Sequence, residues 1–215
     1  AKFLAGKGAN VIIAARNPEK GAKAVAEVKL SGSGKIDLLQ LDLADLSSVR
    51  RAAEQAATQY GPLDALINNA GIMQTPKQKT ADGFEMQLGT NHLGHFLLAA
   101  LLYDRVKQAK GRIVTLSSIA HKFGKIHFDN LMLERGYDPT TSYTQSKHAN
   151  MVFGLELDRR LRAAGEPVMS VICHPGYSDT ALQSTGPGAL FSGVYKVPNA
   201  LLAQPAKLGA YPAVL

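Results

Sequence analysis

The sequence contains one cysteine, Cys173, no tryptophan, and no apolar run of the roughly 18 to 20 residues that a membrane span needs. A single cysteine excludes a disulfide framework within the chain. The opening residues, AKFLAGK, lack the pattern of a secretory signal. We therefore expect a cytoplasmic protein that folds without disulfides.

Acidic residues are outnumbered: 17 of them stand against 24 lysines and arginines, which gives a net charge of +7 over 215 residues. Such an excess can indicate nucleic acid, a membrane surface or an anionic small molecule as the partner. The basic residues are scattered along the chain and form no cluster, so a solvated basic surface explains them and we expect no nucleic-acid binding.

Short apolar runs alternate with helical patterns along the whole chain. Runs of nearly continuous apolar character are typical of strands covered on both faces of a parallel sheet. Strands that alternate with helices form right-handed βαβ units, so we predict one α/β domain over residues 1–215 with a doubly wound parallel sheet, the Rossmann fold. The predicted strands are 9–15, 35–41, 63–68, 112–117 and 168–173, and the predicted helices are 18–29, 45–60, 82–107 and 142–164.

The chain lacks a G-x-G-x-x-G motif after a strand, where a dinucleotide fold normally places its phosphate-binding turn. Residues 1–4 instead predict the last turns of a helix that ends at Gly6 or Gly8, because helices favour glycine at their carboxyl ends. In the usual strand order 3-2-1-4-5-6, a missing first strand leaves the second and fourth strands without their shared neighbour. We therefore expect a domain that is incomplete at both ends.

Tyr143 and Lys147 are four residues apart in a predicted helix, so both side chains lie on one face. An ammonium close to a phenol favours the phenolate and is expected to lower the pKa of the tyrosine, which prepares it for proton transfer near neutral pH. Taken alone, this spacing is also common on surface helices. Polar groups that end three predicted strands, at Asn68, Ser118 and His174, add weight because such strand ends face one crevice.

Together these elements resemble the short-chain dehydrogenase/reductase family, in its retinol-dehydrogenase-like and WW-domain-oxidoreductase-like branch. The resemblance spans nearly the whole chain in the order of the family. It is carried by residues 41–43, 68–71, 91–96, 117–118, 143–147 and 175–180.

The resemblance implies four catalytic positions: Asn91, Ser118, Tyr143 and Lys147. It assigns Tyr143 as the general acid/base, and Lys147 as the group that lowers its pKa and binds the nicotinamide ribose. Ser118 would polarise the substrate oxygen, while Ser117 would be structural. Asn91 would hold a water that links Lys147 to solvent, and a buried amide that kinks its helix is an alternative compatible with this role.

The resemblance also implies a cofactor site. Asp42 would meet the adenine amino group with Leu43 beside it, although a turn or cap role for Asp42 is an alternative. Thr180 would contact the carboxamide. The remaining residues expected to bind the cofactor are Asn68, Asn69, Ala70, Gly71, Tyr143, Lys147, Pro175 and Gly176.

Arg16 follows the first predicted strand directly, where an acidic residue would accept from a ribose 2′-hydroxyl and an arginine would pair with a 2′-phosphate. We therefore predict NADP(H) as the cofactor, with Lys20 assisting. His92 and His95 lack further ligands at a metal-site spacing, so no metal is expected. Residues 121–139 are expected to wall the substrate site, and residues 190–202 to form a substrate lid or a packed helix.

These residues predict an oxidoreductase that transfers a hydride between NADP(H) and a carbonyl or alcohol of an apolar small molecule. The alternative is an inactive, truncated Rossmann-fold fragment that acts as a binding module or has no activity. Pairing into a homo-oligomer is expected only by analogy.

Overall fold

The computed structural model describes residues 1–175, 178–179, 204–205 and 210–214. Gly176, Thr180 and the stretch 190–202 of the sequence predictions lie outside the described residues. The strands are β1 (Val11–Ala15), β2 (Ile36–Gln40), β3 (Ala65–Asn68), β4 (Arg112–Leu116), β5 (Met169–Cys173), β6 (Ser178–Asp179) and β7 (Gln204–Pro205). The α-helices are α1 (Lys2–Gly6), α2 (Pro18–Lys29), α3 (Leu46–Gln59), α4 (Met86–Leu88), α5 (Gly94–Gln108) and α6 (Pro139–Ala163).

Shorter helical segments complete the described part of the chain. A π-helical turn, η1 (Gly89–Leu93), joins α4 to α5. The remaining three are 3-10 helices, namely η2 (Ile119–Phe123), η3 (Phe128–Asn130) and η5 (Tyr211–Ala213).

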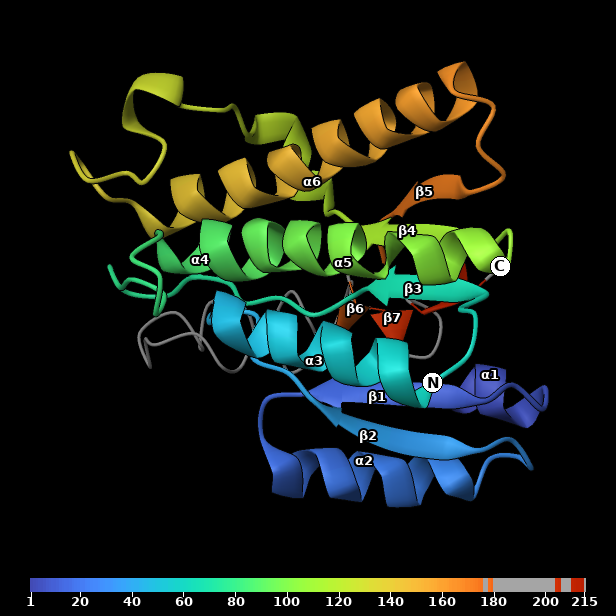
Figure 1. Cartoon of the computed structure of the whole chain (residues 1–215). Coiled ribbons are helices and arrows are strands. Elements are labelled where there is room, and N and C mark those ends of the chain that lie inside the picture. The colour runs from blue at the N-terminus through green and yellow to red at the C-terminus, as the bar shows by residue number, and fades with distance from the viewer. Residues whose placement is uncertain (176–177, 180–203, 206–209, 215) are drawn as a thin grey trace.

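The strands are parallel, as predicted, but they form separate sheets (Figure 1). β1 pairs with β2, with Val11 opposite Ile36, and β4 pairs with both β3 and β5. Among the described residues no ladder joins β1 to β3.

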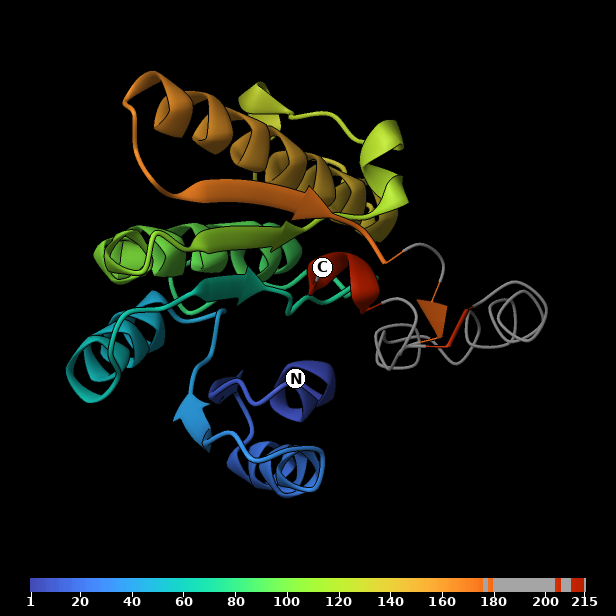
Figure 2. The same ribbon diagram turned by 90° about the vertical axis from the view of Figure 1, so that its right-hand side faces the viewer.

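Helices cover both faces of β1 and β2, and α5 and α6 pack against β3, β4 and β5 (Figures 1 and 2). Successive residues of a strand point to opposite faces. Val11 and Ile13 of β1 accordingly pack with α1 and α2, whereas Ile12 packs with α3 and α5. The fold is therefore a doubly wound α/β fold, with α3, α5 and α6 on one face.

Local capping signals explain which helix predictions were correct. α2 has the predicted bounds because Asn17 accepts from the Lys20 amide at 2.8 Å and Pro18 occupies the first turn. α6 begins at Pro139, earlier than predicted, because the Asp138 carboxylate accepts from the Thr141 amide at 2.6 Å.

The predicted helix 82–107 is wrong in its first part. Asp82 does not begin it; its carboxylate accepts from the Leu46 amide at 2.9 Å, at the start of α3. Glu85 caps α4 instead, and η1 then interrupts the α-helical hydrogen bonds. π-helical turns of this kind occur often at functional sites.

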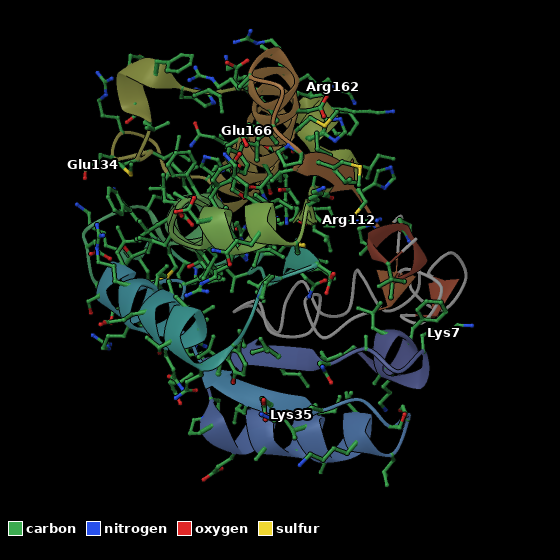
Figure 3. All side chains as sticks on the ribbon, turned by 45° about the vertical axis from the view of Figure 1, so that its right-hand side comes forward. Lys7, Lys35, Arg112, Glu134, Arg162 and Glu166 are labelled. Carbon is green, nitrogen blue, oxygen red and sulfur yellow. The ribbon has the colours of Figure 1, made fainter. Side chains whose placement is uncertain are left out.

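The segment between η2 and α6 stands at the outer edge of the molecule, where Figure 3 shows Glu134. Lys79 Nζ meets the Glu134 carboxylate there at 2.7 Å. Within the described residues, every helix is too short or too polar to cross a membrane.

Candidate active site

Ser118, Tyr143 and Lys147 come together at the carboxyl end of β4. Ser118 stands two residues after that strand, and the two other residues lie in the first three turns of α6. Ser118 hydrogen-bonds to the Tyr143 side chain, and Lys147 Nζ lies 5.9 Å from the centre of the Tyr143 ring. The structure thus brings together three of the four residues assigned to catalysis.

Two hydrogen bonds fasten Lys147 to the end of β4. Ser117 Oγ donates to the Lys147 carbonyl at 2.8 Å, and Lys147 Nζ donates to the Leu116 carbonyl at 3.2 Å. Ser117 therefore has the structural role that was expected of it. An ammonium carries three donors, so two remain for other partners.

The expected lowering of the Tyr143 pKa is not seen. Tyr143 is 8% exposed, and burial raises the pKa of its phenol, while the hydrogen bond with Ser118 acts in the opposite direction. Lys147 is 4% exposed, and burial lowers its pKa to about 8. For Tyr143, burial therefore outweighs the hydrogen bond with Ser118 in setting the pKa.

Asn91 is a fully buried amide in η1. Its Nδ2 donates to the Ile72 carbonyl and to Ser146 Oγ, both at 2.9 Å, and its Oδ1 accepts from the Ile72 amide at 2.8 Å. The burial that the alternative expects of this amide is confirmed, and the residue lies in a π-helical turn. The predicted water at Asn91 stays a prediction.

The loop after β3 lies beside these residues. A β-carbon on Gly71 would stand 3.2 Å from Asn91 Oδ1 and 3.6 Å from Lys147 Nζ, so the backbone of this loop lies against the site. Asn68 is 2% exposed, yet neither of its side-chain polar atoms has a partner. Buried polar groups are normally paired, so this amide fits a site that completes its bonds with a bound molecule or water. Asn69 and Ala70 are exposed.

The two residues assigned to the adenine have structural contacts. Asp42 Oδ1 accepts from the Ala44 amide at 2.9 Å, which is the turn role weighed as an alternative. Leu43 packs in the core between α3 and α5. Any contact of Leu43 with a cofactor would therefore come from its backbone.

An open hollow lies between the end of β1 and the start of α2. It is lined by Ala15, Arg16, Asn17, Lys20, Gly21 and Ala24. Two cationic side chains and a helix N-terminus at one hollow favour an anionic group. The residues fit the 2′-phosphate predicted for this place. Pro175 follows β5 at the carboxyl side of the sheet.

Sequence reasoning missed two buried amides of α6. Gln145 accepts from the His127 amide and donates to the Leu131 carbonyl, both at 2.9 Å, and so holds the segment 119–133 against the active site. Asn150 donates to the Leu116 carbonyl at 3.1 Å. The spacing of Asn150, three residues after Lys147, is the one sequence signal that places it on the same face.

The two histidines of η1 and α5 use Nδ1 for hydrogen bonds. His92 Nδ1 lies 3.0 Å from Asn150 Oδ1, and His95 Nδ1 lies 3.0 Å from the Asn91 carbonyl. Within the described residues there is no group of three side chains suited to a metal ion.

The parallel strands, the covering helices and the polar groups at the strand ends define an α/β protein of the dinucleotide-binding class. The model of the short chain dehydrogenase family matches residues 1–187. The chain belongs to this family.

Individual relatives agree with this assignment. Retinol dehydrogenase 11 of Mus musculus is 47% identical over 178 residues, which cover 82% of this chain and 56% of the relative. A structure from Mycobacterium paratuberculosis is 48% identical with a TM-score of 0.74, covering 84% of this chain and 64% of the other. A short chain dehydrogenase from Burkholderia cenocepacia in complex with NADP is 26% identical with a TM-score of 0.73, covering 98% and 81%. The chain spans about half the length of the curated relatives it matches.

Proposed function

We propose that the protein is an NADP(H)-dependent oxidoreductase that reduces the carbonyl group of an apolar small molecule, with Tyr143 as the proton donor. The observation that carries the proposal is the meeting of Ser118, Tyr143 and Lys147 at the end of β4. Retinoids are the first substrates to test, because several relatives are named retinol dehydrogenases. A cytoplasmic location and a homo-oligomer belong to the same proposal.

Proton donation follows from the protonation state of Tyr143. Burial raises its pKa, so the phenol is protonated at neutral pH but is a weaker acid, and the Lys147 ammonium would favour the phenolate as the proton leaves for a substrate oxygen. The Ser118 hydroxyl, bonded to the phenol, would hold the same oxygen. Lys147 would use its two remaining donors toward the ribose and toward the phenolate that is left after the transfer.

Arg16, Lys20 and the loop at Gly71 would hold the dinucleotide. The nicotinamide, when bound, would supply the hydride. NADP in the Burkholderia cenocepacia relative supports the choice of cofactor, as does the cationic hollow at Arg16.

The test is a titration of NADPH and separately of NADH, followed by cofactor fluorescence, which is convenient because the chain has no tryptophan. Reduction of all-trans-retinal is then measured with the preferred cofactor. Tyr143→Phe should lower the rate by about 100-fold to 10,000-fold without loss of NADPH binding. Tyr103→Phe, on α5, is the matched control and should keep the rate.

A full rate in Tyr143→Phe would refute the assignment of the proton donor. A folded chain that binds neither cofactor would support the alternative of a non-catalytic fragment.

A further inference from the structure

A buried amide shares the acceptor that holds Lys147. Asn150, which is 2% exposed, donates from Nδ2 to the Leu116 carbonyl at 3.1 Å, and Lys147 Nζ donates to the same oxygen at 3.2 Å. A carbonyl oxygen has two lone pairs, so these two donors saturate it. The position of the ammonium therefore depends on a neighbour that the proton transfer itself does not use.

His92 sets the direction of this amide. The Asn150 Oδ1 atom can only accept, so the His92 Nδ1 that lies 3.0 Å away must carry the proton. With its oxygen held by His92, Asn150 turns its NH₂ group toward Leu116. A turned amide would set two oxygens against each other at Leu116 and leave the His92 N–H without an acceptor.

The imidazole of His92 is itself held in place. It packs edge-on against Phe153, with ring centres 6.0 Å apart, and Phe96 lies at 6.3 Å. Burial lowers the pKa of His92, so the ring tends toward its neutral form, in which Nδ1 still carries the proton. The aromatic contacts thus hold the His92 ring in place, and its Nδ1–H donates to Asn150 Oδ1.

We propose that Asn150, oriented by His92, is a positioning residue for Lys147. The positive end of the amide weakens the hold of the Leu116 carbonyl on the ammonium and limits Lys147 to one bond there. Its two other donors stay available on the side of Tyr143. This inference rests on the role proposed above for Lys147.

The other titratable groups around Lys147 are few in the described part of the chain. Cys173 faces it from β5, His95 from α5, and Tyr143 from its own helix. Burial lowers the pKa of His95 to about 4 and raises that of the Cys173 thiol, so both are neutral near pH 7. A change in the titration of Lys147 can therefore be traced to the amide.

The test measures the pKa of Lys147 by NMR on protein with labelled lysine side chains, free of cofactor, with Lys147→Arg used to assign the signal. Asn150→Leu removes the positive end of the amide while keeping its approximate shape. The pKa of Lys147, about 8, should rise by about half a unit or more. Asn130→Leu is the matched control, because the Asn130 side chain bonds to the backbone of Arg135, and it should leave the pKa of Lys147 unchanged.

His92 gives an independent pair of variants. His92→Leu removes the donor and should raise the pKa of Lys147, whereas His92→Asn places an amide N–H near the position of Nδ1 and should restore it. This pair also decides the matter if Asn150→Leu fails to fold. An unchanged pKa in folded His92→Leu would overturn the proposal, as would failure of His92→Asn to restore it.

The proposed function and this inference can fail separately. The titration needs neither cofactor nor substrate, so it holds or fails whether or not the chain reduces a carbonyl. In an active preparation, Asn150→Leu should also raise the apparent pKa on the alkaline side of the pH profile of kcat. The rise should equal the rise in the pKa of Lys147 measured by NMR.

Discussion

Asn91 in η1 donates a hydrogen bond to Ser146 Oγ in α6 at 2.9 Å, and Ser146 Oγ donates in turn to the Tyr143 carbonyl at 2.8 Å. The same amide holds both backbone groups of Ile72. One side chain therefore links the loop after β3 to the turn of α6 that carries Tyr143.

Asn91→Leu should lower the free energy of unfolding by about 3 kcal/mol, because it leaves the amide and carbonyl of Ile72 without partners. Asn10→Leu removes one exposed bond, to the Lys35 amide, and should cost about 1 kcal/mol or less. Urea unfolding of both variants measures the difference. An equal loss of unfolding free energy in the two variants would show that the buried bonds of Asn91 stabilise the fold no more than the exposed bond of Asn10.

Arg16→Glu should weaken NADPH binding by about tenfold to 100-fold, because it removes a charge-assisted bond and adds repulsion at the hollow after β1. NADH lacks the 2′-phosphate, so its affinity should change little. Lys20→Gln should have a smaller effect in the same direction. The measurement is fluorescence titration, and an equal loss for both cofactors would argue against a phosphate contact at Arg16.

Gly124→Ala should destabilise the protein, because the added β-carbon would stand 2.3 Å from the Thr144 carbonyl oxygen in α6. The segment at η2 would have to move away from the catalytic turn, at a cost of about 1 to 3 kcal/mol. Gly61→Ala is the matched control, because nothing lies within 4 Å of its β-carbon. Thermal unfolding compares the two, and a tolerated Gly124→Ala would mean that this segment shifts freely.

Acid should destabilise the fold through His95, which is 5% exposed. Burial lowers its pKa from 6.5 to about 4, so the unfolded chain binds the proton more tightly. The contribution is fully present above pH 6.5 and is lost as the pH falls toward 4. At pH 4.5 the loss is about 2.5 kcal/mol.

His95→Asn keeps a donor for the Asn91 carbonyl but cannot titrate. Its free energy of unfolding should fall less than that of the original chain between pH 7 and pH 4.5, by about 2.5 kcal/mol. Urea unfolding at the two pH values tests this, and the same pH slope in both proteins would contradict it.

Elements with local signals could be predicted from the sequence. The bounds of α2 follow from Asn17 and Pro18, since a cap and a first-turn proline act within one turn. The role of Asp82 could not be predicted, because its partner is Leu46, which is 36 positions away. The residues of η1 include no proline and no capping side chain, so no local signal marks the change in hydrogen bonding there.

The predictions for the active site show the same difference between local signals and contacts of distant segments. The spacing of Tyr143 and Lys147 is a local signal and places both side chains beside Ser118. The pKa of Tyr143 was predicted in the wrong direction, because burial depends on the packing of distant segments. Gln145 and Asn150 could not be predicted for a related reason. Their partners, His127 and Leu116 respectively, come close to them only in the folded chain.

The separation of β1 from β3 in the described chain has an expected consequence for how the fold opens. Between these two strands, the described chain is joined by the side chains of α3 and α5, among them Val49 and Leu98, and by no shared ladder. Side-chain packing can loosen without breaking the ladders on either side. The amide protons of β1 and β2 should therefore exchange with solvent through a partial opening that leaves those of β4 protected, so that the fold behaves as two cooperative units.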